Sequence, residues 1–290
     1  MQTKTKFFLI IFTILLLVAA MFIFFFSGNE GEIEVMVLMY HDIATYAAAD
    51  NPWVVSADAF SNQMQLLAMG NYPVISFDDL IAFVDGKLDL PQRVILISFD
   101  DGYQSNLDLA APVLEELSIP ALISVLGVQL GQSTYRHTDI PELPFFHLED
   151  TIPWVQAGVF SIGHHSYDMH MLEYREPAET FRMGVLRRED ETYETWRAAF
   201  TEDFLHLQTK LYETLGVPAT IFAYPFGHHN EETENLLKEL GIRVTLTSIE
   251  GINTVRQGEP QSLFALRRVN IEEHMVGDYF INYLNWAWTW

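Results

Sequence analysis

The sequence predicts a mainly parallel α/β domain that closes, or nearly closes, into a (β/α) barrel and is preceded by one N-terminal transmembrane helix. Short apolar strands alternate with amphipathic helices along most of the chain, and no repeat, low-complexity run or Pro/Gly-rich linker interrupts them. A long apolar run lies ahead of all these elements. The alternation predicts the domain, and the apolar run predicts the membrane helix.

The apolar run extends from Phe7 to Phe26 and contains one threonine as its only polar residue. As a helix it is about 30 Å long, enough to cross the bilayer core once. Lys4 and Lys6 favour a cytoplasmic N-terminus, which puts the rest of the chain outside the cell. A cleaved signal peptide is the alternative, and the domain would then be secreted. The expected organisation is a cytoplasmic segment 1–6, a membrane anchor 7–26, a linker 27–34 and an extracellular domain 35–290.

The composition excludes several kinds of chemistry. The chain has no cysteine, so disulfides and thiol catalysis are excluded. Its formal net charge is −23, and residues 1–30 contribute +1 through Lys4, Lys6 and Glu30, so the remainder carries −24. Such a surface repels nucleic acid and anionic lipid headgroups, and we expect no nucleic-acid partner. A neutral or cationic partner is compatible with this surface. The alternative is that the acidic residues form a solvated face that binds no partner.

The strands and helices are expected in a regular order after the linker. Residues 34–41 form the first strand, and Ser56 caps a helix over 56–70. RVILISF at 93–99 is apolar after its first residue, which is typical of a strand buried on both faces of a parallel sheet. Further strands are expected at 72–77, 120–127, 159–165, 219–227, 242–248 and 263–271. Further helices are expected at 78–86, 107–118, 202–216 and 231–241.

Chemically active side chains stand where expected strands end. Asp100 and Asp101 directly follow the apolar strand 93–99, and His41, His165 and Pro225 lie at the ends of other strands. In parallel barrels the active site is built at the carboxyl ends of the strands. Adjacent carboxylates disfavour each other's ionisation, so this pair needs a positive partner.

A divalent metal is one such partner. One carboxylate and two imidazoles are a common ligand set for Zn²⁺, or a similar ion, that activates water. Asp101, His165 and His170 could supply this set, which leaves Asp100 as the base. Zinc is the first choice, but nickel, cobalt, iron and manganese accept the same ligands.

Three segments resemble the polysaccharide deacetylases, the NodB-homology group also known as carbohydrate esterase family four. They are FDDG at 99–102, HSYDMH at 165–170 and YPFG at 224–227, each at the end of a strand. The wide spacing of the two histidines is similar to that of the poly-N-acetylglucosamine deacetylases of biofilm systems. The resemblance covers residues 36–271 and implies a distorted or incomplete (β/α) barrel of the NodB-homology type.

The resemblance also implies roles for individual residues. Asp100 matches the catalytic base of the family, and Asp101, His165 and His170 match its metal ligands. VLMYHDI at 37–43 resembles the N-terminal motif that carries the general acid in the biofilm-type relatives, and it offers His41 for this role.

The remaining roles are assigned to residues of YPFG, to Tyr103 and to an arginine near the end of the domain. Pro225 and Phe226 match the motif beside the acetyl group, and the backbone N–H of Phe226 can serve the oxyanion although the usual tyrosine is absent. Tyr103 follows FDDG and is expected to line the pocket. The arginine that precedes YPFG in many members is missing, and Arg268 best replaces it as the residue that orients the base. Arg267 is the alternative, since strand alternation puts only one of the two on the inner face.

The resemblance implies a metal-dependent hydrolase that removes acetyl groups from an N-acetylglucosamine-containing polysaccharide outside the cell. Peptidoglycan and O-acetylated polymers are alternative substrates, and a relative that binds sugar without activity is the non-enzymatic alternative. An ester needs less protonation of its leaving group than an amide does, so replacement of His41 should distinguish the two reactions.

Several conspicuous residues fall outside these roles. His164 should point away from the metal ligands, toward a second layer of contacts or the surface, and Asp168 should either orient a ligand histidine or cap a turn. Residues 173–196 are expected to be helical in part and to form a loop or cap over the groove. The alternation of three tryptophans favours an amphipathic closing strand or a membrane-proximal edge over sugar stacking. These tryptophans are Trp286, Trp288 and Trp290.

Overall fold

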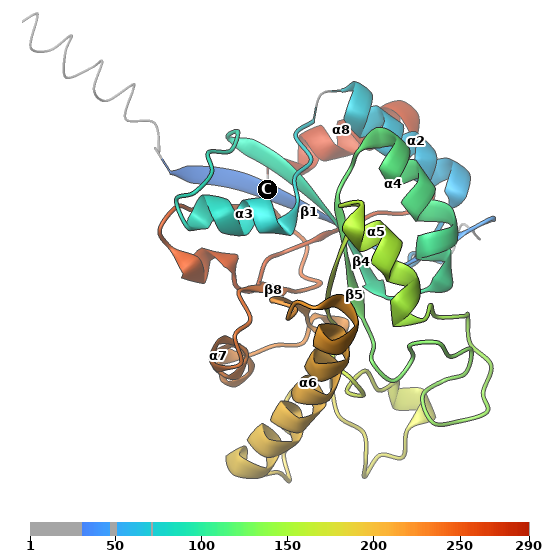
Figure 1. Ribbon diagram of the computed structural model, residues 1–290, viewed down its shortest axis with the longest axis vertical. Coiled ribbons are helices and arrows are strands. Elements are labelled where there is room, and N and C mark those ends of the chain that lie inside the picture. The colour runs from blue at the N-terminus through green and yellow to red at the C-terminus, as the bar shows by residue number, and fades with distance from the viewer. Residues whose placement is uncertain (1–30, 47–50, 71, 290) are drawn as a thin grey trace, which may run out of the picture. The chain divides into compact units, whose positions relative to one another are not determined.

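The computed structural model describes residues 31–46, 51–70 and 72–289, and its folded body, Ile33–Trp290, is built on one eight-stranded sheet (Figure 1). The expected anchor 7–26 and the cytoplasmic segment 1–6 lie outside the described residues. Among the residues that are described, none of the helices combines the length and apolar character that a membrane crossing requires. The first strand begins at Glu32, within the range expected as linker.

The main sheet has the order β10-β1-β4-β5-β6-β7-β8, with β9 paired to β1, and β2 and β3 form a separate pair. Its neighbouring strands from β1 to β8 run parallel, as predicted. The strands are β1 (Glu32–Tyr40), β2 (Asp42–Ala44), β3 (Val54–Ser56), β4 (Arg93–Asp101), β5 (Ala121–Val125), β6 (Phe160–His164), β7 (Ile221–Ala223), β8 (Val244–Leu246), β9 (Asn253–Arg256) and β10 (Val269–Asn270).

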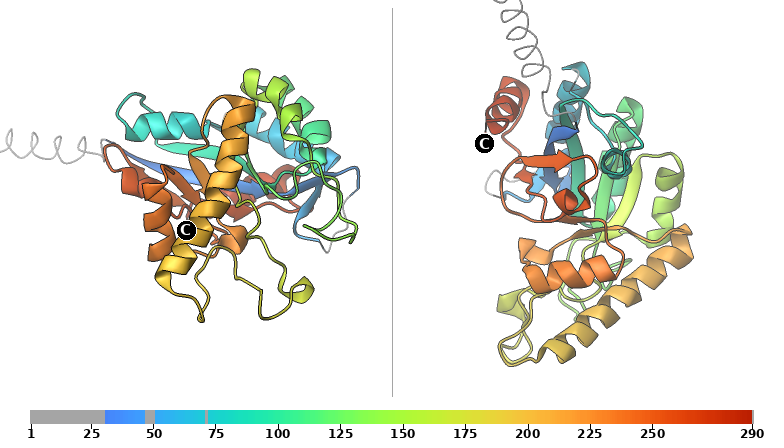
Figure 2. Two further views of the ribbon diagram at one scale, coloured as in Figure 1. Left: turned by 60° about the horizontal axis from the view of Figure 1, so that its bottom comes forward. Right: turned by 90° about the vertical axis from the view of Figure 1, so that its left-hand side faces the viewer.

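Helices connect the strands and cover the outside of the sheet (Figure 2). The α-helices are α2 (Ala57–Met69), α3 (Phe77–Val84), α4 (Ala111–Leu117), α5 (Ile152–Gln156), α6 (Tyr193–Leu215), α7 (Glu231–Glu239) and α8 (Gly277–Ala287). A π-helical turn, η1 (Asn106–Ala110), precedes α4, and short 3₁₀ turns are η2 (Leu148–Thr151), η3 (Glu173–Arg175), η4 (Pro225–Gly227) and η5 (Pro260–Leu263).

The two edges of the sheet meet through the segment 266–270. Leu266 forms a bridge with Leu246 of β8, and the Arg268 N–H donates to the Ile249 carbonyl at 2.9 Å. Val269 then pairs with Leu38 of β1. The sheet is therefore an incomplete barrel that one short segment closes, as the sequence predicts.

The core forms because the central strands are apolar along their length. Every residue of β4 after Arg93 is buried, since both faces of this parallel strand are covered. The rings of Tyr40, Phe60 and Phe99 pack together with centroids 5.3, 5.4 and 5.7 Å apart. Ser56 caps α2 as expected, because its hydroxyl accepts from the Ala59 N–H at 3.2 Å.

Two expected strands are much shorter than the sequence suggested. Within 72–77, Val74 makes a single bridge to Ile95, and a capping box at Ser76 starts α3 immediately afterwards. Within 263–271, only Val269–Asn270 forms a strand, because Ala265 adopts a left-handed conformation with φ of 55°.

The expected closing strand at the C-terminus is instead the helix α8. Phe280, Leu284 and Ala287 are buried at helical spacing, and this pattern outweighs the short alternation of tryptophans. Trp286 is exposed and Trp288 is buried.

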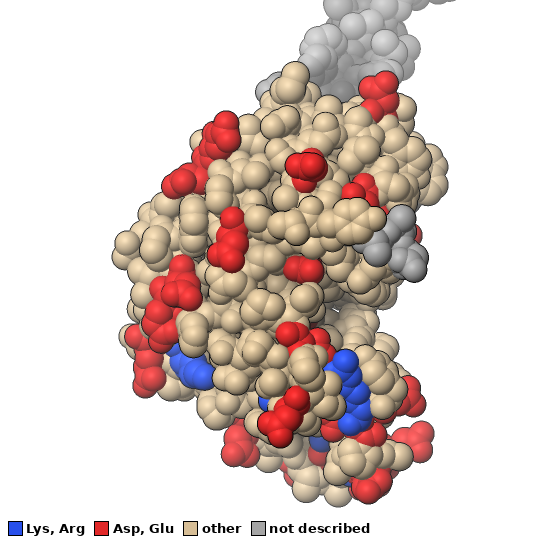
Figure 3. Space-filling view, turned by 90° about the vertical axis from the view of Figure 1, so that its right-hand side faces the viewer, with Lys and Arg blue, Asp and Glu red and all other residues tan. Residues whose placement is uncertain are grey.

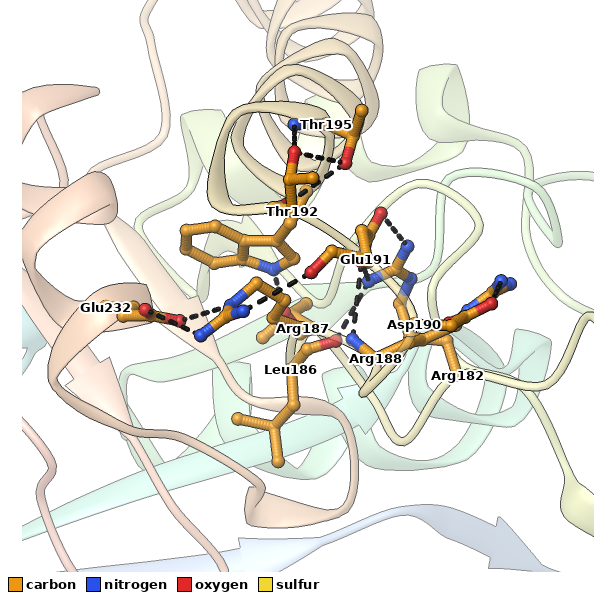
Figure 4. A network of polar contacts seen from close by, with 11 residues as sticks. Arg182, Leu186, Arg187, Arg188, Asp190, Glu191, Thr192, Thr195 and Glu232 are labelled. Carbon is orange, nitrogen blue, oxygen red and sulfur yellow. Dashed lines mark hydrogen bonds and ion pairs between the residues drawn. The ribbon is translucent and has the colours of Figure 1, made fainter.

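Residues 173–196 are helical in part and otherwise form loops, as expected. The turn η3 opens the segment, loops follow, and α6 begins at Tyr193 with Thr192 as its cap. Charged pairs hold the loops (Figure 4): Arg182 donates to Glu191 at 2.8 and 2.9 Å, and Arg187 donates to Glu232 of α7 at 3.1 and 3.2 Å. The first pair lies within the loop, and the second joins the loop to α7.

Phe60→Ala tests the packing of α2 on the sheet. The ring is fully buried between Tyr40 and Phe99, so its loss should lower the free energy of unfolding by about 3–5 kcal/mol. Urea denaturation measures this change. Leu205→Ala on the exposed side of α6 is the control and should cost less than about 0.5 kcal/mol. Equal losses in the two variants would contradict this assignment of the core.

Candidate active site

The strand β4 ends in the two aspartates, and both line one pocket. Consecutive strand residues normally point to opposite faces. Asp101 instead has a left-handed backbone with φ of 73°, which breaks the alternation. Gly102 continues the turn with φ of 92°, and a Cβ there would lie 3.2 Å from Val125 Cγ1. The FDDG motif is thus a backbone turn that brings two adjacent carboxylates to the same pocket.

Asp100 is buried against Arg268. The guanidinium donates from Nη1 to Oδ1 at 2.8 Å and from Nη2 to Oδ2 at 2.7 Å, and its Nε donates to the Thr247 carbonyl at 2.6 Å. Burial would raise the pKa of Asp100, but the charge and hydrogen bonds of Arg268 hold it well below its usual range. Asp100 is therefore ionised. Arg268 is the inward arginine of the pair considered from the sequence, while Arg267 is exposed.

Asp101 faces the two histidines of HSYDMH. Its Oδ1 lies 3.6 Å from His165 Nε2 and 4.0 Å from His170 Nε2, and the three ligand atoms lie within 4.8 Å of one another. Asp101 Oδ1 is buried without a hydrogen-bond partner. A buried, unpartnered carboxylate oxygen facing two imidazole nitrogens fits a divalent cation, whose ligands are of these types.

Both histidines are in the state that a metal requires. His165 Nδ1 lies 2.8 Å from the Ala223 carbonyl, so this nitrogen carries the proton and Nε2 offers its lone pair toward Asp101. Burial lowers the pKa of His165, and it lowers the pKa of His170 to about 4. The imidazoles are therefore neutral near pH 7 and able to bind a metal.

His41 lies on the other side of Asp100. Its Nε2 is 4.0 Å from Asp100 Oδ2, and its ring packs edge-on against Trp53 with centroids 4.8 Å apart. The side chain of Asn106, at the start of the π-helical turn, donates to the His41 carbonyl at 2.8 Å. Asp100 thus stands between the histidine at the end of β1 and Arg268 from the closing segment.

The other predicted site residues differ in how closely they approach the pocket. Phe226 lines it with φ of 59°, and its ring centroid is 4.1 Å from that of His170. Tyr103 also lines the pocket, where its ring stacks on Phe145 with centroids 4.8 Å apart. Burial, followed by the charge of Asp101, raises the pKa of the Tyr103 hydroxyl. Pro225 is buried next to Gly184 and does not belong to the lining.

His164 points away from the pocket, as expected, and is fully buried, with its ring stacked on Phe204 at 4.3 Å. Asp168 neither orients a ligand histidine nor caps a turn. Its carboxylate instead accepts from Arg136 Nε at 2.6 Å and lies 3.0 Å from His137 Nε2.

The pocket has a volume of about 540 Å³ and includes residues that the sequence motifs did not indicate. The only available signal was the occurrence of aromatic and charged residues in polar loops, and it is weak. Arg136 pairs with Glu176, and Arg175 pairs with Glu142, which links the loops of this wall. The additional lining residues include Trp53, Tyr135, Arg136, Glu142 and Tyr174.

The α/β barrel carries a pocket of paired carboxylates and histidines at its strand ends, an arrangement that hydrolases of the metal-assisted type use. The family model described as "Polysaccharide deacetylase" matches residues 87–245, a range that contains FDDG, HSYDMH and YPFG. The chain belongs to the polysaccharide deacetylase family, and the resemblance drawn from the three motifs is confirmed. His41 and Arg268 lie outside the matched range.

Relatives of known name agree with this assignment. YxkH of Bacillus subtilis, assigned to the polysaccharide deacetylases, is 25% identical over 88% of this chain and 78% of its own length. The poly-β-1,6-N-acetyl-D-glucosamine N-deacetylase of Staphylococcus aureus is 19% identical over 77% of this chain and 64% of its own length. The Escherichia coli enzyme of the same name is 20% identical, and the match spans 35% of its length.

Solved structures show the same fold. IcaB from Ammonifex degensii has a TM-score of 0.70 at 23% identity, over 88% of this chain and 97% of that one. A de-N-acetylase from Aggregatibacter actinomycetemcomitans has a TM-score of 0.73 at 21% identity, over 86% and 99% of the two chains.

Arg268→Met tests the ionisation of Asp100. Without the guanidinium, burial should raise the pKa of Asp100. The acid limb of the pH profile of kcat/KM for deacetylation should therefore move to higher pH. An unpaired buried charge should also lower the free energy of unfolding at pH 7 by about 3–5 kcal/mol. In the wild type, the contribution of Asp100 to stability is complete above its unfolded pKa of about 3.9 and is lost as pH falls through the lower folded value.

The matched control is Arg267→Met, which removes the same charge from the exposed neighbour and should leave the pH profile unchanged. An acid limb at the same pH in Arg268→Met and in the wild type would contradict the assigned role of Arg268.

Proposed function

We propose that this protein is an extracytoplasmic, metal-dependent N-deacetylase of an N-acetylglucosamine-containing polysaccharide, with poly-N-acetylglucosamine or a similar polymer as substrate. One observation carries the proposal. The adjacent Asp100 and Asp101 share a pocket but face different partners, an arginine for the first and two histidines for the second. This arrangement separates a base from a metal ligand.

The metal site consists of Asp101, His165 and His170. Their nitrogen and oxygen donors suit zinc best, and nickel, cobalt, iron and manganese are also compatible. When bound there, a divalent ion lowers the pKa of a water molecule and polarises the acetyl carbonyl.

The surrounding residues complete the hydrolysis. Asp100, kept ionised by Arg268, takes the proton of the attacking water. The backbone N–H of Phe226 donates to the oxyanion of the tetrahedral intermediate. His41, on the other side of Asp100, protonates the leaving amine, and acetate departs. Tyr103 shapes the pocket, and Pro225 fixes the turn that carries Phe226.

The substrate proposal rests on charge and on the relatives. Figure 3 shows acidic side chains scattered over the face that it presents, with few basic ones. Such a surface accepts a neutral polymer and the cationic amines that deacetylation produces. The Staphylococcus aureus and Escherichia coli relatives are named for poly-β-1,6-N-acetyl-D-glucosamine.

The cellular location is proposed from the sequence. A cytoplasmic segment 1–6, an anchor 7–26 and a linker 27–34 would hold the domain 35–290 outside the membrane. Cleavage after the apolar run would release the same domain.

Acetate release from β-1,6-linked N-acetylglucosamine oligomers tests the proposal. Chelation of the full-length protein should abolish release, and added Zn²⁺ or another single divalent metal should restore it. Asp100→Asn should reduce the restored rate by about 10²–10⁴-fold, because the general base is lost. If acetate is released only from peptidoglycan or only from O-acetylated xylan, that polymer replaces poly-N-acetylglucosamine as the proposed substrate. Oligomer binding without release from any substrate would indicate a sugar-binding relative.

A further inference from the structure

The loop between the two proposed histidine ligands is held by the helix α6. This loop comprises residues 166–169. Asp203 of α6 accepts two hydrogen bonds from it: Oδ1 from the Tyr167 N–H at 2.8 Å and Oδ2 from the Asp168 N–H at 2.7 Å. Each carboxylate oxygen therefore has its own peptide donor. Burial raises the pKa of Asp203 to about 6, although the two donated hydrogen bonds act to lower it. The carboxyl group is therefore ionised above neutral pH.

The opposite edge of the loop is bonded to the chain that leaves β5. The Gly127 N–H donates to the Ser166 carbonyl at 3.1 Å, and the Val128 N–H donates to the Tyr167 carbonyl at 2.8 Å. Ser166 has a left-handed backbone with φ of 71°, and its hydroxyl accepts from the Met169 N–H at 3.1 Å. The loop is thus fixed from two sides, and α6 supplies one of them through Asp203.

The side chain of Tyr167 packs on the same helix. Its ring lies parallel to that of His206 with centroids 3.8 Å apart, and the Lys210 ammonium is 5.6 Å from its centre. Asp203, His206 and Lys210 follow at intervals of three and four residues, so they form one face of α6. This face receives the loop.

The two histidines depend on this loop to different degrees. His165 follows β6 directly, and its ring is fixed by the Ala223 carbonyl. His170 lies beyond the loop, yet its Nε2 reaches within 4.0 Å of Asp101 Oδ1. The path of residues 166–169 therefore decides where His170 arrives.

We propose that Asp203 is a positioning residue of the metal site, whose carboxylate fixes the Tyr167 and Asp168 peptides so that His170 faces Asp101. This inference rests on the proposed function, because it requires a metal at Asp101, His165 and His170. Asparagine at position 203 has nearly the same shape but only one acceptor oxygen. Its amide group would place a donor against one of the two peptide donors.

The test compares Asp203→Asn with Glu202→Gln in the full-length protein. Each variant removes one negative charge from α6, but Glu202 is exposed, so it is the matched control. Zn²⁺ and Co²⁺ dissociation constants are measured by chelator competition at pH 8, where Asp203 is ionised. Asp203→Asn should weaken metal binding by about 10–100-fold, and Glu202→Gln should leave it unchanged.

Two further readouts separate positioning from a general structural role. Acetate release by Asp203→Asn should recover when metal is in excess, since the chemistry itself is intact. Hydrogen exchange at the Tyr167 and Asp168 amides should become faster in the metal-free variant, while exchange in the central strands stays unchanged.

Each outcome bears on a different claim. A wild-type protein that binds no metal overturns both the proposed function and this inference. A wild type that binds metal, together with an Asp203→Asn variant that binds it equally well, overturns this inference alone, as does equal weakening in Glu202→Gln. If Asp203→Asn is unfolded by circular dichroism, Asp203→Glu replaces it under the same criteria, because it keeps both acceptors but displaces them.

Discussion

The ion pair between Asp100 and Arg268 is the interaction on which the rest of the site depends. A carboxylate buried at the end of β4 costs several kcal/mol unless a cation pairs with it, and its neighbour Asp101 adds a second negative charge. Arg268 supplies the cation from the segment 266–270, which also joins the two edges of the sheet. Closure of the barrel and ionisation of Asp100 are therefore brought about by the same few residues.

Unfavourable backbone conformations are concentrated around the pocket. Asp101, Ser166 and Phe226 all have positive φ, which costs a residue other than glycine about 1 kcal/mol or more. Each of these positions turns the chain where a strand or its extension delivers a functional group. Hydrogen bonds and packing hold these turns: β5 and α6 hold the loop after His165, and β4 and β5 pair beside Asp101. The site is built on backbone geometry that its surroundings enforce.

Much of the fold and of the candidate site could be predicted because the signals are local. The apolar run of β4 and the motifs at strand ends identify the sheet and its active edge, and alternation correctly predicts that only one of Arg267 and Arg268 faces inward. What the sequence missed depends on contacts between distant residues. Asp203 is separated from Tyr167 by many residues, so no spacing rule links them. The contact of Arg187 with Glu232 and the burial of α8 likewise override local patterns.

Anomalous diffraction at the zinc absorption edge, from crystals of the protein grown with Zn²⁺, tests most directly how Asp100 and Asp101 divide their roles. We expect one strong peak at about 2.0–2.2 Å from a carboxylate oxygen of Asp101 and from Nε2 of His165 and His170, with Asp100 still paired to Arg268. A peak bound by Asp100 in place of Asp101, or ordered zinc only at other sites, would contradict the division of roles between the two aspartates.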